Sequence, residues 1–212
     1  MPVSHDLRCI FVHVPRTGGT SIETALGLKG DWRIENTHSM FGRITSPDLK
    51  QRIKSTDYLQ HLTANELRSL LLHEFQNYYR FAFVRNPWDR MVSIYCHMDP
   101  HMKLEAEPGR PFTGTSFGEF LEWSENITDA HLAPQYTYLY AANGACLLDF
   151  VGRFEQLDQD FGRICAHLGV RLELPRVNAS VRADYRDYYN DTTRRLIERR
   201  YGEDVERFGY RF

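Results

Sequence analysis

Short apolar runs along the chain alternate with segments whose apolar residues recur at helical spacing. Residues 9–14 are apolar apart from one histidine, and residues 81–84 are apolar throughout, so both segments predict buried strands. Residues 147–151 predict a further strand. Because strand and helix signals alternate along the chain, the pattern predicts an α/β fold with a central parallel sheet flanked by helices on both faces.

Capping residues indicate where several helices begin. Thr63-Ala-Asn-Glu66 has the pattern of a capping box, and Ser116-Phe-Gly-Glu119 opens a second predicted helix. Residues 157–168 carry a regular apolar face, and Asp191 is predicted to cap the last helix. Residues 56–60 fit a short strand, although the region around them gives a weak pattern.

The first predicted strand leads into a glycine turn that is typical of an anion-binding loop. Pro15 ends the strand, and Gly18 and Gly19 lack side chains, so backbone N–H groups can face a ligand closely. The start of the following helix favours a phosphate or sulfate. Side-chain donors are added by Arg16, Thr17, Thr20 and Ser21. The alternative is a plain tight turn, and the spacing of the nucleoside triphosphatase P-loop is absent.

A second candidate anion site follows the strand at residues 81–84. Asn86 is a suitable helix cap, and Arg85 stands at the strand end, where ligands bind in parallel α/β folds. Arginine can hold a phosphate through a forked pair of hydrogen bonds, and Ser93 lies off the apolar face of the next helix. The alternative is that Arg85 pairs with Asp89 and only stabilises the fold. Two such sites suit a ligand with two separate anionic groups.

These two motifs, in this order, resemble sulfotransferase family 2, which includes carbohydrate sulfotransferases. The residues concerned are Pro15-Arg-Thr-Gly-Gly-Thr-Ser21 and Phe83-Val-Arg-Asn-Pro-Trp-Asp-Arg90. Further similarity lies at residues 151–155, 177–180 and 204–210. The resemblance implies a single P-loop-like domain over residues 1–212. It also implies transfer of a sulfuryl group from 3′-phosphoadenosine 5′-phosphosulfate (PAPS) to a hydroxyl, with a carbohydrate or glycan expected as acceptor.

The resemblance also implies roles for individual residues. The first motif would hold the 5′-phosphosulfate and the second the 3′-phosphate. The predicted donor-binding residues are Arg16, Thr17, Gly18, Gly19, Thr20, Ser21, Arg85 and Ser93. Arg16 is also predicted to be catalytic, because it would stabilise the leaving phosphate; the family usually has lysine at this position, and arginine keeps the charge with a different donor geometry. No metal is expected, because the leaving group is already a stable anion.

His61 is the predicted general base that removes the acceptor proton. It precedes the capping box at Thr63, in a stretch that resembles the one where the family's glycan enzymes place a catalytic histidine. The other candidates are His13, His38, His97, His131 and Glu155. His13 lies inside the first strand, where a core histidine is the simpler interpretation. Residues 131–140 either line the acceptor site or pack on the core.

Composition narrows the class of protein. The formal net charge of −2 argues against a nucleic-acid partner. The chain has no run of 18 apolar residues and no signal peptide, so a cytoplasmic protein without a transmembrane segment is expected. The four cysteines lie in apolar segments and are predicted to be reduced core thiols.

Two other functions remain open from the sequence. A non-catalytic module that binds an adenosine phosphate or a sulfated glycan would use the same anion sites. A P-loop kinase would need the P-loop lysine and a metal-binding acid after a strand. The lysine is missing, and Asp149 is a poor substitute for the acid without it.

Overall fold

The computed structural model describes residues 3–28, 30–97, 116–175, 177 and 182–212. Contacts between residues group the chain into two compact units. Unit 1 comprises Met1–Val84 and Gln135–Asn178, and unit 2 comprises Arg85–Pro134 and Ala179–Phe212. The expectation of one sulfotransferase-like domain over residues 1–212 stays a prediction.

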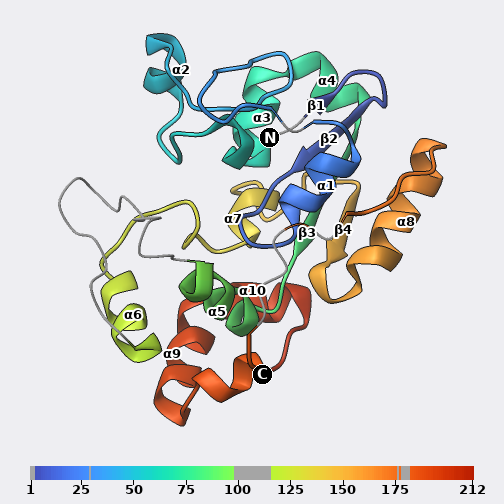
Figure 1. Ribbon diagram of the computed structural model, residues 1–212. Helices are drawn as coiled ribbons and strands as arrows, with labels where there is room; N and C mark the ends of the chain where they lie inside the picture. Colours follow the sequence, from blue (N-terminus) through green and yellow to red (C-terminus); the bar gives the residue numbers. More distant parts are fainter. Residues whose placement is uncertain (1–2, 29, 98–115, 176, 178–181) are drawn as a thin grey trace. The chain divides into compact units, whose positions relative to one another are not determined.

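Both units contain helices, and the strands belong to unit 1 (Figure 1). The elements of unit 1 are β1 (Val3–Ser4), β2 (Cys9–Val12), α1 (Gly19–Ala25), α2 (Pro47–Arg52), η1 (Leu59–His61), α3 (Ala64–Leu70), α4 (Leu72–Asn77), β3 (Tyr79–Val84), α7 (Tyr136–Leu139), β4 (Phe150–Arg153), η2 (Phe154–Gln156) and α8 (Leu157–Leu168). The elements of unit 2 are α5 (Pro87–His97), α6 (Phe117–Ser124), η3 (Tyr185–Tyr188), α9 (Asp191–Arg200) and α10 (Gly202–Phe208). The labels η1 to η3 denote short 3₁₀-helices.

Unit 1 is built on a four-stranded sheet in the order β1-β2-β3-β4. β2, β3 and β4 run parallel, with Phe11 opposite Phe81 and Phe81 opposite Phe150. β1 pairs antiparallel with β2 at one edge. The predicted α/β class with a central parallel sheet is therefore confirmed, and the antiparallel edge strand is an addition that the sequence pattern did not indicate.

Both faces of this sheet are covered. On one face, Phe11 and Phe81 belong to an apolar cluster that includes Ile22 of α1 and Ile164 of α8. Successive side chains of a strand point to opposite faces, and Ile10, which neighbours Phe11, is also fully buried. Burial on both faces explains why the strands read as continuous apolar runs in the sequence.

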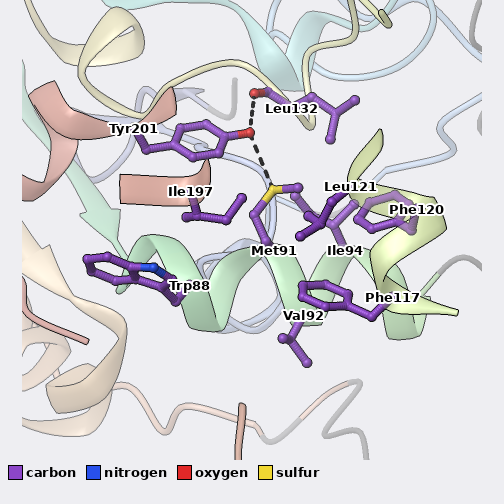
Figure 2. Packing of buried hydrophobic residues seen from close by; sticks show 10 residues of the cluster. All are labelled: Trp88, Met91, Val92, Ile94, Phe117, Phe120, Leu121, Leu132, Ile197 and Tyr201. Atoms are coloured by element: carbon purple, nitrogen blue, oxygen red, sulfur yellow. Dashed lines mark hydrogen bonds between the residues drawn. The ribbon is translucent and has the colours of Figure 1, made fainter. Parts of the chain in front are cut away.

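Helix α5 carries much of the apolar core of unit 2 (Figure 2). Trp88, Met91 and Val92 are buried on it, at the spacing expected for one face of a helix. The Tyr201 hydroxyl donates a hydrogen bond to the Leu132 carbonyl at 2.8 Å and lies 3.3 Å from the Met91 sulfur. Burial raises the pKa of the Tyr201 phenol, so it remains a hydrogen-bond donor inside this core.

The predicted helix starts are largely confirmed, and one predicted strand is wrong. Capping boxes are present at Thr63 and Ser116. Asn190 rather than Asp191 caps the last helical region. Residues 56–60 do not form a strand; they contain a single isolated bridge and lead into η1. The reason is a set of contacts distant in sequence, described below, that hold η1 against the loop around Gly42.

The cysteines are reduced, but only two of them lie in the core. Cys9 and Cys165 are buried, whereas Cys96 and Cys146 are exposed, so the prediction of four core thiols is wrong for the latter pair. Burial raises the pKa of the Cys9 thiol to about 12, which keeps it protonated and unreactive at neutral pH.

Candidate functional site

The turn between β2 and α1 has an unusual backbone. Arg16 and Gly18 both lie in the left-handed region, with φ of 68° and 88°. For a non-glycine residue this conformation costs about 1 kcal/mol or more, and such strain tends to gather at binding sites. The fully buried Thr17 stabilises the turn, because its hydroxyl donates to the Val14 carbonyl at 2.8 Å. The loop is therefore held in one defined shape.

The loop joins α1 at Gly18 and Gly19. Gly18 is the cap of α1, and Ser21 N–H donates to its carbonyl at 3.1 Å. The N–H groups of Gly19 and Thr20 come before this first helical hydrogen bond. The Ser21 hydroxyl accepts a hydrogen bond from Val177 N–H at 3.3 Å, so the side chain of Ser21 also fixes a later part of the chain. The half-buried side chains of Arg16 and Thr20 complete the set of polar groups here.

A buried histidine lies against the loop. His13 follows β2, and its Nδ1 is 2.6 Å from Oε1 of Glu23, which is on α1. Glu23 is 4% exposed and His13 is 8% exposed. A side chain at position 19 would overlap the imidazole, since an ideal Cβ on Gly19 would lie 2.0 Å from His13 Nε2. Gly19 is therefore required by the close approach of this ring as well as by the turn.

We expect Gly19→Ala to destabilise the protein by about 1–3 kcal/mol, because the added methyl overpacks this site and displaces His13. The matched control is Gly162→Ala in α8, where an added Cβ would have no atom within 4 Å apart from the backbone of its own helix and its chain neighbours. Glycine is unfavourable inside a helix, so this control is expected to gain about 0.5–1 kcal/mol. Thermal unfolding of the two variants measures the opposite shifts. Equal stability of Gly19→Ala and the wild type would contradict the placement of the His13 ring.

His61, the predicted base, lies beside His13. It ends η1 and is 9% exposed. The two imidazole rings meet edge to face, with centroids 4.9 Å apart and an interplanar angle of 63°. η1 is held in place by Leu59 N–H, which donates to the Gly42 carbonyl at 2.9 Å, and by the Gln60 side chain, which accepts from Gly42 N–H at 3.0 Å. His61 is thus on a fixed element whose neighbour is the histidine that contacts Gly19.

The second predicted site lies at the start of α5 in unit 2. Asn86 caps this helix, because its side-chain oxygen accepts a hydrogen bond from Trp88 N–H at 3.0 Å, and Pro87 is the first helical residue. The Asn86 side chain also donates to the Arg211 carbonyl at 2.8 Å. Arg85 immediately precedes this cap and is 6% exposed. Ser93, also buried, lies on α5.

Two arginines share one carboxylate at this site. Arg85 Nε donates to Asp89 Oδ2 at 2.7 Å, and Arg182 donates to the other oxygen of the same carboxylate. The ion pair considered as an alternative for Arg85 is therefore present, but the three side chains together keep one excess positive charge. Nη1 of Arg182 is buried and has no hydrogen-bond partner among the described residues. Buried polar nitrogens are nearly always hydrogen-bonded, so this nitrogen of Arg182 is an exception within the described residues.

The other candidate bases have different surroundings. His131 Nδ1 lies 2.9 Å from Asp129; burial alone would raise the pKa of Asp129, but hydrogen bonds from His131 outweigh it and lower the pKa. The ring of His38 stacks on that of His5 at 4.3 Å. His97 is half-buried at the end of α5. Glu155 is a candidate only if its carboxylate is buried near the site, and this expectation is wrong because Glu155 is exposed in η2.

The segment proposed to line the acceptor site contains both core and partly exposed aromatics. Tyr138 in α7 is buried, whereas Tyr136 and Tyr140 are half-buried. The Asn65 side chain donates to the Tyr140 carbonyl at 3.0 Å and fixes the end of α7. Of the three tyrosines, Tyr138 therefore has the role of a core residue.

Among the residues that the structure describes, no three His, Cys, Asp or Glu side chains gather in an arrangement that could hold a metal ion. Within the same part of the chain, no helix has both the length and the apolar character needed to cross a membrane.

Comparison with known proteins adds to this geometry. The profile described as "Sulfotransferase family" matches residues 1–211. The chain belongs to the sulfotransferase family. Mouse carbohydrate sulfotransferase 14 is 21% identical over 182 residues, which cover 76% of this chain and 44% of that protein. An uncharacterized protein of Archaeoglobus fulgidus is 34% identical over 116 residues, covering 53% of this chain and 86% of that protein. The crystal structure of a sulfotransferase from Alicyclobacillus acidocaldarius aligns with a TM-score of 0.47 and 18% identity, over 94% of this chain and 95% of that one.

In this chain the predicted residues fall into two groups. Unit 1 holds the loop residues from Arg16 to Ser21 together with His61, and unit 2 holds Arg85 and Ser93. Residues 178–180, part of a segment that resembled the family, lie outside the described residues. Sequence reasoning missed Glu23 and Arg182. Glu23 lies four residues after Gly19 on the predicted helix, so its place near the loop could have been inferred from the sequence. Arg182 is 93 residues from its partner Asp89, and no local pattern links the two.

Proposed function

We propose that this sulfotransferase transfers a sulfuryl group from PAPS to a hydroxyl group, with a carbohydrate as acceptor. The observation that carries the proposal is the strained loop from Arg16 to Gly19, with the buried His13 against Gly19 and the ring of the buried His61 in contact with that of His13. An anion-binding loop and a base are the two groups that such a transfer requires. The printed name of the mouse relative supports a carbohydrate as the acceptor.

The donor is proposed to be held at its two phosphate ends. Arg16 and the backbone N–H groups of Gly19 and Thr20 would hold the 5′-phosphosulfate, with Thr17, Gly18 and Ser21 shaping the loop. Arg85 and Ser93 would hold the 3′-phosphate, and the excess positive charge of the arginine pair at Asp89 supports this assignment. An anion at that site would also give the buried nitrogen of Arg182 an acceptor.

The proposed reaction needs positioning and charge neutralisation more than covalent chemistry by the protein. His61 removes the proton from the acceptor hydroxyl as its oxygen bonds to sulfur. The bond between sulfur and the bridging oxygen of the 5′-phosphate breaks, and the electron pair leaves with the phosphate. Arg16 stabilises the charge that develops on this leaving group, as does the loop backbone.

We expect transfer to proceed in the presence of a chelator of divalent ions. The leaving group is a stable anion that Arg16 can neutralise, so the chemistry does not call for a bridging metal. Initial rates with and without a chelator, followed by addition of magnesium, measure the dependence. Complete loss of activity in the chelator and its recovery with magnesium would favour a kinase-like reaction instead.

The direct test is a transfer assay with radiolabelled PAPS against a panel of hydroxyl acceptors that includes carbohydrates. Appearance of label in an acceptor, with one adenosine 3′,5′-bisphosphate formed per label transferred, is the expected result. Binding of adenosine 3′,5′-bisphosphate without transfer to any acceptor would indicate a binding module. Transfer of phosphate from ATP in a parallel assay would indicate a kinase.

A further inference from the structure

The buried pair of Glu23 and His13 has no role in the mechanism described so far. A carboxylate can only accept a hydrogen bond, so the contact of 2.6 Å between Glu23 Oε1 and His13 requires that Nδ1 carries the proton. In the neutral ring, Nε2 then has the lone pair. A carboxylate on one ring nitrogen is the usual device for fixing the tautomer and orientation of a functional histidine.

The pair is also placed where it can act on the reaction. His13 Nε2 occupies the space beside Gly19, at the loop proposed to hold the phosphosulfate. Its ring meets the ring of His61 edge to face, with centroids 4.9 Å apart. Glu23, His13 and His61 therefore form a continuous series from α1 through the end of β2 to η1.

The burial of Glu23 and His13 strengthens the electrostatic interactions within this series. The side chains of Glu23 and His13 are only 5% and 10% exposed, so water contributes little to the solvation of the carboxylate. Electrostatic interactions are stronger in such surroundings than in water. A positive charge that arises on a neighbouring imidazole is stabilised by a carboxylate held in this way.

We propose that Glu23 and His13 are positioning residues for the general base His61 in this sulfotransferase. Glu23 fixes the tautomer and ring plane of His13, and His13 in turn fixes the ring of His61 beside the loop. When the acceptor O–H bond breaks and its proton moves to His61, the carboxylate of Glu23 stabilises the imidazolium through His13. The inference rests on the proposed sulfuryl transfer and adds two residues to it.

The test variant is Glu23→Gln, which keeps the size of the side chain and removes its charge. With para-nitrobenzyl alcohol as acceptor, kcat is expected to fall about 10–100-fold, the range for loss of a carboxylate partner of a functional histidine. With the more acidic para-nitrophenol the defect is expected to shrink, because this acceptor loses its proton more readily. Affinity for adenosine 3′,5′-bisphosphate is expected to stay unchanged, and Glu23→Asp is expected to recover part of the rate.

The matched control is Asp160→Asn in α8, which also neutralises a buried carboxylate of unit 1. Asp160 pairs with Arg163 and accepts from Arg153 N–H, so this control reports the effect of losing a buried carboxylate that is bonded to arginines rather than to a histidine. It is expected to affect the two acceptors equally.

A readout independent of transfer is the imidazole nitrogen NMR spectrum. The wild type is expected to show His13 protonated at Nδ1, and Glu23→Gln is expected to weaken this preference. His13 protonated only at Nε2 in the wild type would overturn the inference whatever the activity. Equal rate losses for both acceptors, or no loss, in an active enzyme would overturn the positioning role alone. A wild type that transfers no sulfuryl group would overturn the proposed function as well.

Discussion

His61→Ala is expected to lower kcat for sulfuryl transfer about 10²–10⁴-fold, the usual contribution of general-base catalysis. The side chain belongs to η1, which is held in place by hydrogen bonds with Gly42. The ring of His61 lies against that of His13. Removal of the imidazole leaves no group on η1 that can take the acceptor proton. The dissociation constant of adenosine 3′,5′-bisphosphate should hardly change, because neither proposed phosphate site uses this side chain.

The matched control is His73→Ala, which removes an exposed histidine on α4 and should keep normal turnover. Steady-state kinetics and calorimetric binding on both variants give the comparison. Near-normal turnover of His61→Ala would assign the proton to another residue, with His13 as the first candidate. Loss of nucleotide binding together with turnover would show that His61 is structural.

Arg85→Ala is expected to weaken binding of adenosine 3′,5′-bisphosphate at least tenfold and to leave binding of AMP nearly unchanged. A charge-assisted hydrogen bond contributes about 1.5–3 kcal/mol, which corresponds to this loss or more. AMP lacks the 3′-phosphate, so it gains little from Arg85. Calorimetry with both nucleotides measures the difference.

Two further variants sharpen this test. Arg85→Lys keeps the charge and loses the forked geometry, so its affinity for the bisphosphate should fall between those of the wild type and Arg85→Ala. Arg80→Ala removes an arginine of β3 that pairs with Asp149, and this variant should bind both nucleotides normally. Equal affinity of the wild type for AMP and the bisphosphate would contradict the proposal that Arg85 and Ser93 bind the 3′-phosphate.

Local chemistry explains why much of the fold was predictable from the sequence. Apolar runs in the sequence predict the buried strands β2 and β3. Pairs of side chains three residues apart predict the caps at Thr63 and Ser116. The two motifs that are predicted to bind phosphate are visible for the same reason, because each lies within one turn between a strand and a helix. Interactions within a few residues are visible in a sequence without knowledge of the fold.

Features that depend on distant contacts were not predictable. The sequence predicts a strand over residues 56–60, but Leu59 and Gln60 are hydrogen-bonded to Gly42 and belong to η1. The pairing of Arg182 with Asp89 joins parts of the chain 93 residues apart. The left-handed conformation of Arg16 has no signal in the residue itself, since arginine rarely adopts it. The sequence predicts His13 as a core residue, and only the fold brings Glu23 and His61 into contact with its ring.

The most direct test of the proposed donor site is a crystal structure of the protein with adenosine 3′,5′-bisphosphate. We expect the 5′-phosphate within hydrogen-bond distance of Arg16 and of the N–H groups of Gly19 and Thr20. We expect the 3′-phosphate of the same nucleotide on Arg85 and Ser93. A nucleotide bound elsewhere, or one whose 5′-phosphate lies away from the loop between β2 and α1, would contradict the proposed donor site.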